Sequence, residues 1–80
     1  MTYDLVDSTG NTGWRIYNLA CYKYQHYARG IWIIDAPVWN GEEDRWDILH
    51  VNPLTGMYAI RSWDNFFGTL PDGGFRFRKV

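Results

Sequence analysis

One cysteine and two histidines are the soft side chains that could hold a metal ion or attack a substrate. His26 follows Cys21 by five residues, and His50 lies much further along the chain. A zinc site would need these three side chains and Asp47 to converge, without the paired ligand spacings that such sites usually show. A Cys–His nucleophile would need an electropositive, partly exposed thiol. We therefore interpret Cys21 as a core residue and both histidines as surface or hydrogen-bonded residues, with no metal ion.

Four carboxylates form the only acidic cluster: Glu42, Glu43, Asp44 and Asp47. Glycoside hydrolysis uses two carboxylates held across a cleft, usually in a larger fold. Three of these four are consecutive after Asn40-Gly41, where like charges repel and favour water, and a calcium loop would alternate its oxygen ligands. The sequence predicts a solvated turn here. Since the glycine-containing segment 10–13 also lacks the lysine of a phosphate-binding loop, we expect a protein without catalytic residues or cofactors.

Aromatic and basic residues alternate at the C-terminus: Phe75, Arg76, Phe77, Arg78 and Lys79. Proteins that bind single-stranded nucleic acid combine stacking rings with a positive groove, and this segment could supply both. Charges on a terminal edge strand also prevent edge-to-edge association, and the chain lacks the Lys/Arg-Gly-Phe strand of an RNA-recognition sheet. We therefore predict that these charges protect the edge of the sheet, and binding of single-stranded nucleic acid is the alternative function.

Aromatic residues make up 19% of the chain, including five tryptophans. Such side chains carry large buried area, and with Arg they dominate binding hot spots. The single cysteine excludes an internal disulfide, so we expect the core to rely on Trp14, Trp32, Trp46 and Trp63 in its place. Trp39 stands beside Asn40-Gly41 and the acidic run, and is predicted to be exposed and functional.

The composition describes an ordinary soluble domain, which we expect to span residues 1–80. The apolar fraction is 46% and the formal net charge is −1. That charge argues against a duplex-DNA binder, which usually has a basic surplus. The N-terminus resembles no signal peptide, no apolar run could span a membrane, and a lone thiol fits a reducing compartment. A cytoplasmic protein without a membrane partner is expected.

Turn residues divide the chain into short elements that are mostly strand-like. Segments 46–51 and 57–63 flank Asn-Pro-Leu-Thr-Gly and predict a β-hairpin. Further strands are expected at residues 2–6, 31–34 and 75–80, and the strand at 31–34 is expected to end at Asp35-Ala36-Pro37. Ser62 or Asp64 could cap one helical turn through Phe67, ended by Gly68. Neither hairpin strand has a uniformly polar side, which favours a sheet with one face on the core and the other partly covered by a helix, a subunit or a target.

Residues 14–29 fit two patterns. Read as a helix, they have a polar stripe, an apolar stripe and a glycine, Gly30, just beyond the end. Read as a strand, they benefit from four tyrosines, which favour sheets. The glycine and Arg29 tip the interpretation toward a helix. The predicted fold is therefore α+β, an antiparallel sheet of four or five strands with one helix (about residues 14–29) on a face; the alternative is a mostly-β small barrel or roll.

These features favour a non-enzymatic module that binds and occludes a partner protein. Aromatic anchors and carboxylates would form its centre, at Trp39, Glu42, Glu43, Asp44 and Trp46. A protein with a basic surface would complement the carboxylates, while the oligomeric state stays open. Compact chains of this size without a cofactor motif include inhibitors of host defence encoded by phages or mobile elements, of the anti-CRISPR or anti-restriction type. That class is an expectation from size alone.

Overall fold

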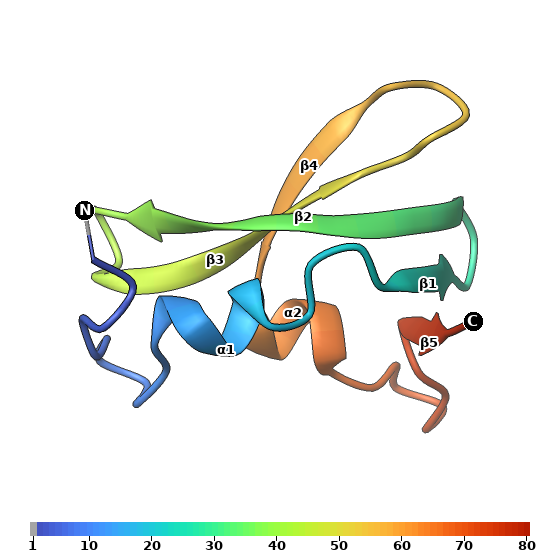
Figure 1. The fold of residues 1–80 in the computed structure, drawn as a ribbon. Helices are drawn as coiled ribbons and strands as arrows, with labels where there is room; N and C mark the ends of the chain where they lie inside the picture. Colours follow the sequence, from blue (N-terminus) through green and yellow to red (C-terminus); the bar gives the residue numbers. More distant parts are fainter. Residues whose placement is uncertain (1) are drawn as a thin grey trace.

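The chain forms five antiparallel strands and two short helices, and the computed structural model describes residues 2–80. The strands lie in one open sheet in the order β4-β3-β2-β1-β5. Both helices cover the same face of it (Figure 1). The predicted α+β class is confirmed, and the sheet does not close into the alternative barrel. Met1 of the predicted domain lies outside the described residues. The bounds are α1 Gly13–Tyr17, β1 Lys23–His26, β2 Gly30–Asn40, β3 Arg45–Val51, β4 Tyr58–Ser62, α2 Trp63–Phe67 and β5 Phe77–Lys79.

The β3–β4 hairpin forms where the turn chemistry predicts it. The side chain of Asn52 accepts a hydrogen bond from the Leu54 amide at 2.9 Å, and Gly56 takes the positive φ of 73° that closes the turn. The chain then enters α2 at the predicted cap, because the Ser62 hydroxyl accepts a hydrogen bond from the Asn65 amide at 3.1 Å. Both the hairpin and the capped helical turn are confirmed. Trp63 begins the helix instead of ending the strand.

Strand β2 is longer than predicted, because it does not end at Asp35-Ala36-Pro37. A bulge between Ile34 and Ala36 absorbs one residue, and pairing with β3 then continues to Asn40. Beside Pro37 the sheet has only β3 as a neighbour, since β1 pairs only with residues 30–33. Pro37 therefore lies on a part of β2 that has one neighbouring strand, where a missing N–H is tolerated.

The predicted helix over residues 14–29 is wrong beyond Tyr17. Helix α1 has five residues, and a turn then leads into β1, which pairs with β2 and β5. Cys21 ends the helical path with a φ of 72°, and its amide donates to the Ile34 carbonyl at 2.8 Å. Gly30, also at positive φ, belongs to the β1–β2 turn and does not cap a helix. The strand preference of the tyrosines prevails here because two neighbouring strands supply partners.

The predicted strand at residues 2–6 does not form; this segment is a turn and loop. Asp7 anchors the loop to the sheet. One carboxylate oxygen accepts the Trp46 amide at 2.8 Å, and the other accepts the amides of Thr9 and Asn11, each at 2.9 Å. The Trp46 indole also donates to the Leu5 carbonyl at 2.7 Å. The segment is thus fixed by a buried carboxylate and not by strand pairing.

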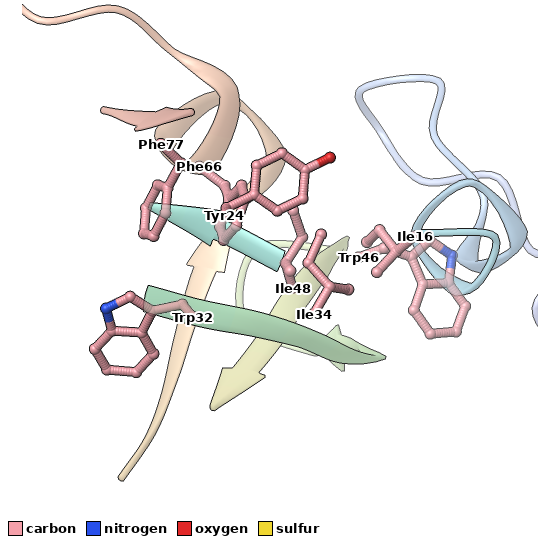
Figure 2. Packing of buried hydrophobic residues seen from close by; sticks show 8 residues of the cluster. All are labelled: Ile16, Tyr24, Trp32, Ile34, Trp46, Ile48, Phe66 and Phe77. Carbon is pink, nitrogen blue, oxygen red and sulfur yellow. The ribbon is translucent and has the colours of Figure 1, made fainter. Parts of the chain in front are cut away.

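The core lies between the sheet and the helices. Figure 2 shows Ile16 and Trp46 at one end of the cluster and Phe66 and Phe77 at the other. The two phenylalanine rings stack with their centroids 4.0 Å apart, which joins α2 to β5. Eight hydrophobic side chains are buried: Ile16, Tyr24, Trp32, Ile34, Trp46, Ile48, Phe66 and Phe77. Trp32 and Trp46 are core residues as predicted, whereas Trp14 is 44% exposed and packs on Tyr3.

Candidate functional site

The face of the sheet opposite the helices is apolar and carries no covering element within residues 2–80 (Figure 1). Its residues alternate along β2, β3 and β4 with the buried ones, and the strand register places them side by side. We call this surface the outer face. It consists of Ile31, Ile33, Ala36, Val38, Leu49, Val51, Tyr58 and Ile60. None of these side chains is buried, and Tyr58 and Ile60 are 59% and 55% exposed.

A polar network closes one end of the outer face. Asp47 lies there, buried, and accepts hydrogen bonds from Asn40 Nδ2 at 3.0 Å and from Arg45 Nε at 2.8 Å. The hydrogen bond to Asp47 and the charges of Asp47 and Glu43 raise the pKa of Arg45. The network is locally neutral, so a partner could cover it without stripping water from an unpaired charge.

A shallow hollow of about 460 Å³ connects this end of the outer face to the acidic turn. Its lining combines apolar residues of the face with polar residues of the β2–β3 turn: Val38, Trp39, Asn40, Gly41, Glu42, Asp47 and Ile60. Apolar contact area and a carboxylate therefore meet at one place. This combination suits a partner surface that presents an apolar side chain next to a basic one.

The predicted acidic turn exists between β2 and β3, with Glu42, Glu43 and Asp44 all exposed. The side-chain oxygen of Asn40 accepts the amides of Glu42 and Glu43 at 3.1 and 3.2 Å, which holds the turn in shape. Asp44 has a φ of 50°, and its carbonyl accepts the Ser8 amide at 3.2 Å. The turn is therefore a shaped, solvated acidic surface.

The two predicted tryptophan anchors lie differently from the prediction. Trp39 and Trp46 are direct cross-strand partners on the core side, with their rings 5.2 Å apart and nearly perpendicular. Trp39 is half-buried and still reaches the hollow. Trp46 is only 1% exposed, so its ring cannot serve as an exposed anchor. Strand register causes the difference, because it turns both rings toward the loop that Asp7 holds.

The C-terminal residues predicted for nucleic-acid binding divide between the core and the surface. Phe77 is buried, and its ring is part of the core cluster. Phe75, Arg78 and Lys79 are exposed and line a hollow of about 340 Å³ beside β1. Arg76 is half-buried and donates to the Asn65 carbonyl at 2.6 Å. The strand occupies the edge of the sheet, as predicted, but only residues 77–79 pair with β1.

Cys21 also lies differently from the prediction, whereas both histidines make a hydrogen bond through Nδ1, one of the two arrangements predicted for them. Cys21 is exposed, because it occupies the turn before β1, and both histidines are buried. Burial has the largest effect on the pKa of His50 and lowers it. The hydrogen bond to the Ile48 carbonyl acts in the opposite direction, and nearby positive charge, including that of Arg61, lowers the pKa further. Among residues 2–80 no three His, Cys, Asp or Glu side chains gather in the manner of a metal site. Neither described helix is long and apolar enough to cross a bilayer.

Comparison with known protein families, with characterised proteins and with solved structures gave no match. The function of this protein is therefore inferred from its own surfaces. None of the predicted site residues belongs to the outer face, although the apolar residues on both sides of the hairpin strands indicate such a face in the sequence. The pattern does not show which residues share this face, because that depends on the register of β2, β3 and β4.

Proposed function

We propose that this protein is a non-enzymatic module that binds a partner protein through the outer face and the acidic turn beside it. The observation that carries the proposal is the uncovered apolar face, which contains adjacent exposed side chains of Tyr58 and Ile60. Exposed apolar patches on small domains commonly mark interaction sites. A chain of 80 residues has little apolar material to spare. Apolar side chains on the solvent side of the sheet are explained if a partner covers them.

The partner that fits this surface is apolar at its centre and basic at one rim. Glu42 faces the hollow, and Glu42 and Asp44 have no cation within ion-pair distance in the described structure, whereas Glu43 lies 3.9 Å from Arg45. Charges at a rim act mainly on the rate of encounter and on specificity. The apolar centre would supply the affinity. By covering a surface of its partner, the module would act through occlusion.

The finer assignments remain proposals of the same kind. A cytoplasmic location is proposed because a lone exposed thiol fits a reducing compartment. Inhibition of a host defence system, of the anti-CRISPR or anti-restriction type, is proposed as the role that occlusion by so small a module would serve. The inhibitory role depends on the binding proposal and on the identity of the partner, whereas the location depends on the thiol alone.

Site-specific photo-cross-linking tests the proposal. A benzophenone amino acid placed at Ile60 is expected to yield a cross-linked adduct with one discrete host protein in cell extract. The matched control places the same group at Val6, which is 62% exposed in the N-terminal loop and outside the outer face. The same adducts from both positions, or no adduct from Ile60, would overturn the proposal. A dimer of this chain cross-linked at Ile60 would contradict it too, by assigning the face to a second copy.

A further inference from the structure

Two guanidinium groups, one from β4 and one from the residue before β5, lie against α2 on the core side of the sheet. Arg61 of β4 donates from Nη1 to the side-chain oxygen of Asn65 at 2.8 Å. Arg76, just before β5, donates from Nη1 to the backbone carbonyl of the same Asn65 at 2.6 Å. Asn65 belongs to α2, so the helix holds both cationic heads against one residue. The Arg61 guanidinium also lies 5.3 Å from the ring centroid of Phe77.

This pair of cations has no carboxylate of its own. Among the described residues, the ion pairs of the chain all involve Arg45, the first residue of β3. The Nε atom of Arg61 is buried and makes no hydrogen bond. Burial lowers the pKa of Arg61 most, and the charges of Arg76 and Arg29 lower it further. Like charges held this closely repel each other unless an anion lies between them.

Two exposed aromatic rings lie next to the backbone of Arg76. The backbone amide of Tyr27 donates to the Arg76 carbonyl at 3.1 Å, and the Tyr27 ring is 62% exposed. Tyr27 and the exposed ring of Phe75 line the same hollow as Arg78 and Lys79. The hollow therefore combines two accessible rings with two cations, and the backbone of Arg76 connects it to the arginine pair. Guanidinium pairs match the geometry of phosphate oxygens, and exposed rings accept unpaired bases whatever their sequence.

We propose that this end of the protein binds the backbone of single-stranded nucleic acid. Arg61 and Arg76 hold a phosphate, and Tyr27 and Phe75 stack against the neighbouring bases. Double-stranded nucleic acid does not fit, because paired bases offer no free faces to these rings and neither five-residue helix could read a groove. The proposal is independent of the outer face. It also differs from the sequence prediction, since Phe77 is buried and Tyr27 and Arg61 take part.

Fluorescence anisotropy with a labelled single-stranded oligonucleotide tests the proposal. Binding is expected to weaken with salt, with a log–log slope of about −2 for three phosphate contacts, one each at the arginine pair, Arg78 and Lys79. Arg76→Gln is expected to weaken binding about tenfold and to reduce the slope by about 0.7. Tyr27→Ala, a surface change, is expected to weaken binding about tenfold at every salt concentration and to leave the slope unchanged. Thermal unfolding of each variant verifies that it is folded.

Arg15→Gln is the matched control, because it removes the same charge from a side chain that packs on Trp63, on a different part of the surface. It is expected to bind like the unmodified protein. Equal losses in Arg15→Gln and Arg76→Gln would overturn the proposal, since they would show attraction by overall charge alone. Absence of binding at low salt, equal affinity for the duplex, or full competition by equimolar inorganic phosphate would overturn it as well.

Discussion

Ile60→Arg is expected to weaken the complex with the partner protein by on the order of 100-fold while leaving the fold intact. Ile60 lies opposite Leu49 in the register and at the edge of the hollow beside Glu42. A guanidinium there would be buried against an apolar surface and close to the basic rim expected on the partner. Its desolvation and its repulsion from that rim would both weaken binding. Titration of the cross-linked partner, once identified, measures the affinity.

The fold should tolerate this change because the Ile60 side chain is 55% exposed on an edge strand. Exposed strand positions usually cost less than about 1 kcal/mol on substitution. Val6→Arg adds the same charge at a position of similar exposure outside the outer face, and is expected to keep full affinity. Equal affinities of the two variants would place the partner elsewhere on the molecule.

Asp7→Ala is expected to lower the free energy of unfolding by about 3 kcal/mol, because hydrogen bonds to a charged acceptor are worth about 1.5–3 kcal/mol each and are not additive. Four donors would lose their acceptor, among them the amide of Trp46 and the hydroxyl of Thr9, which donates at 2.6 Å. The loop over residues 2–12 would then detach from the sheet. For a domain of this size, the melting temperature should fall by about 15 °C. Calorimetry measures both quantities.

The same carboxylate gives the protein a defined sensitivity to acid. Burial alone would raise the pKa of Asp7, but the hydrogen bonds from the Thr9 side chain and from three backbone amides lower it below its ordinary value of 3.8. Its stabilisation is therefore present above pH 3.8 and is lost as the pH falls through the lower, folded-state pKa.

Asp35→Ala is the control for Asp7→Ala, since Asp35 is exposed at the bulge. A melting temperature for Asp7→Ala within about 2 °C of this control would contradict the role of Asp7.

Sequence reasoning succeeds in this chain where local chemistry decides the structure. The β3–β4 turn and the Ser62 cap each need only residues a few positions apart, and both form as predicted. The helix predicted over residues 14–29 fails for the opposite reason. Whether the tyrosines there form a helix or a strand depends on β2 and β5, which are remote in sequence and offer pairing partners.

The candidate sites show the same division. The acidic turn follows from consecutive charged residues after Asn40-Gly41, and its exposure could be predicted. The burial of Trp46 could not, because it depends on register and on the carboxylate of Asp7 from a distant loop. The Arg61–Arg76 pair is likewise invisible in the sequence, since only the position of α2 brings both side chains to Asn65.

Oxidative footprinting of side chains in the presence of the partner tests the central claim most directly, since it reports which face becomes covered. Tyr58 and Ile60, on the outer face, are 59% and 55% exposed, while Trp14 and Tyr17 on the opposite side are 44% and 49% exposed. Protection of Tyr58 and Ile60 in the complex, with unchanged oxidation of Trp14 and Tyr17, is the predicted result. Protection of Trp14 and Tyr17 alone would show that the partner binds the helical side, and would contradict the assignment of the outer face.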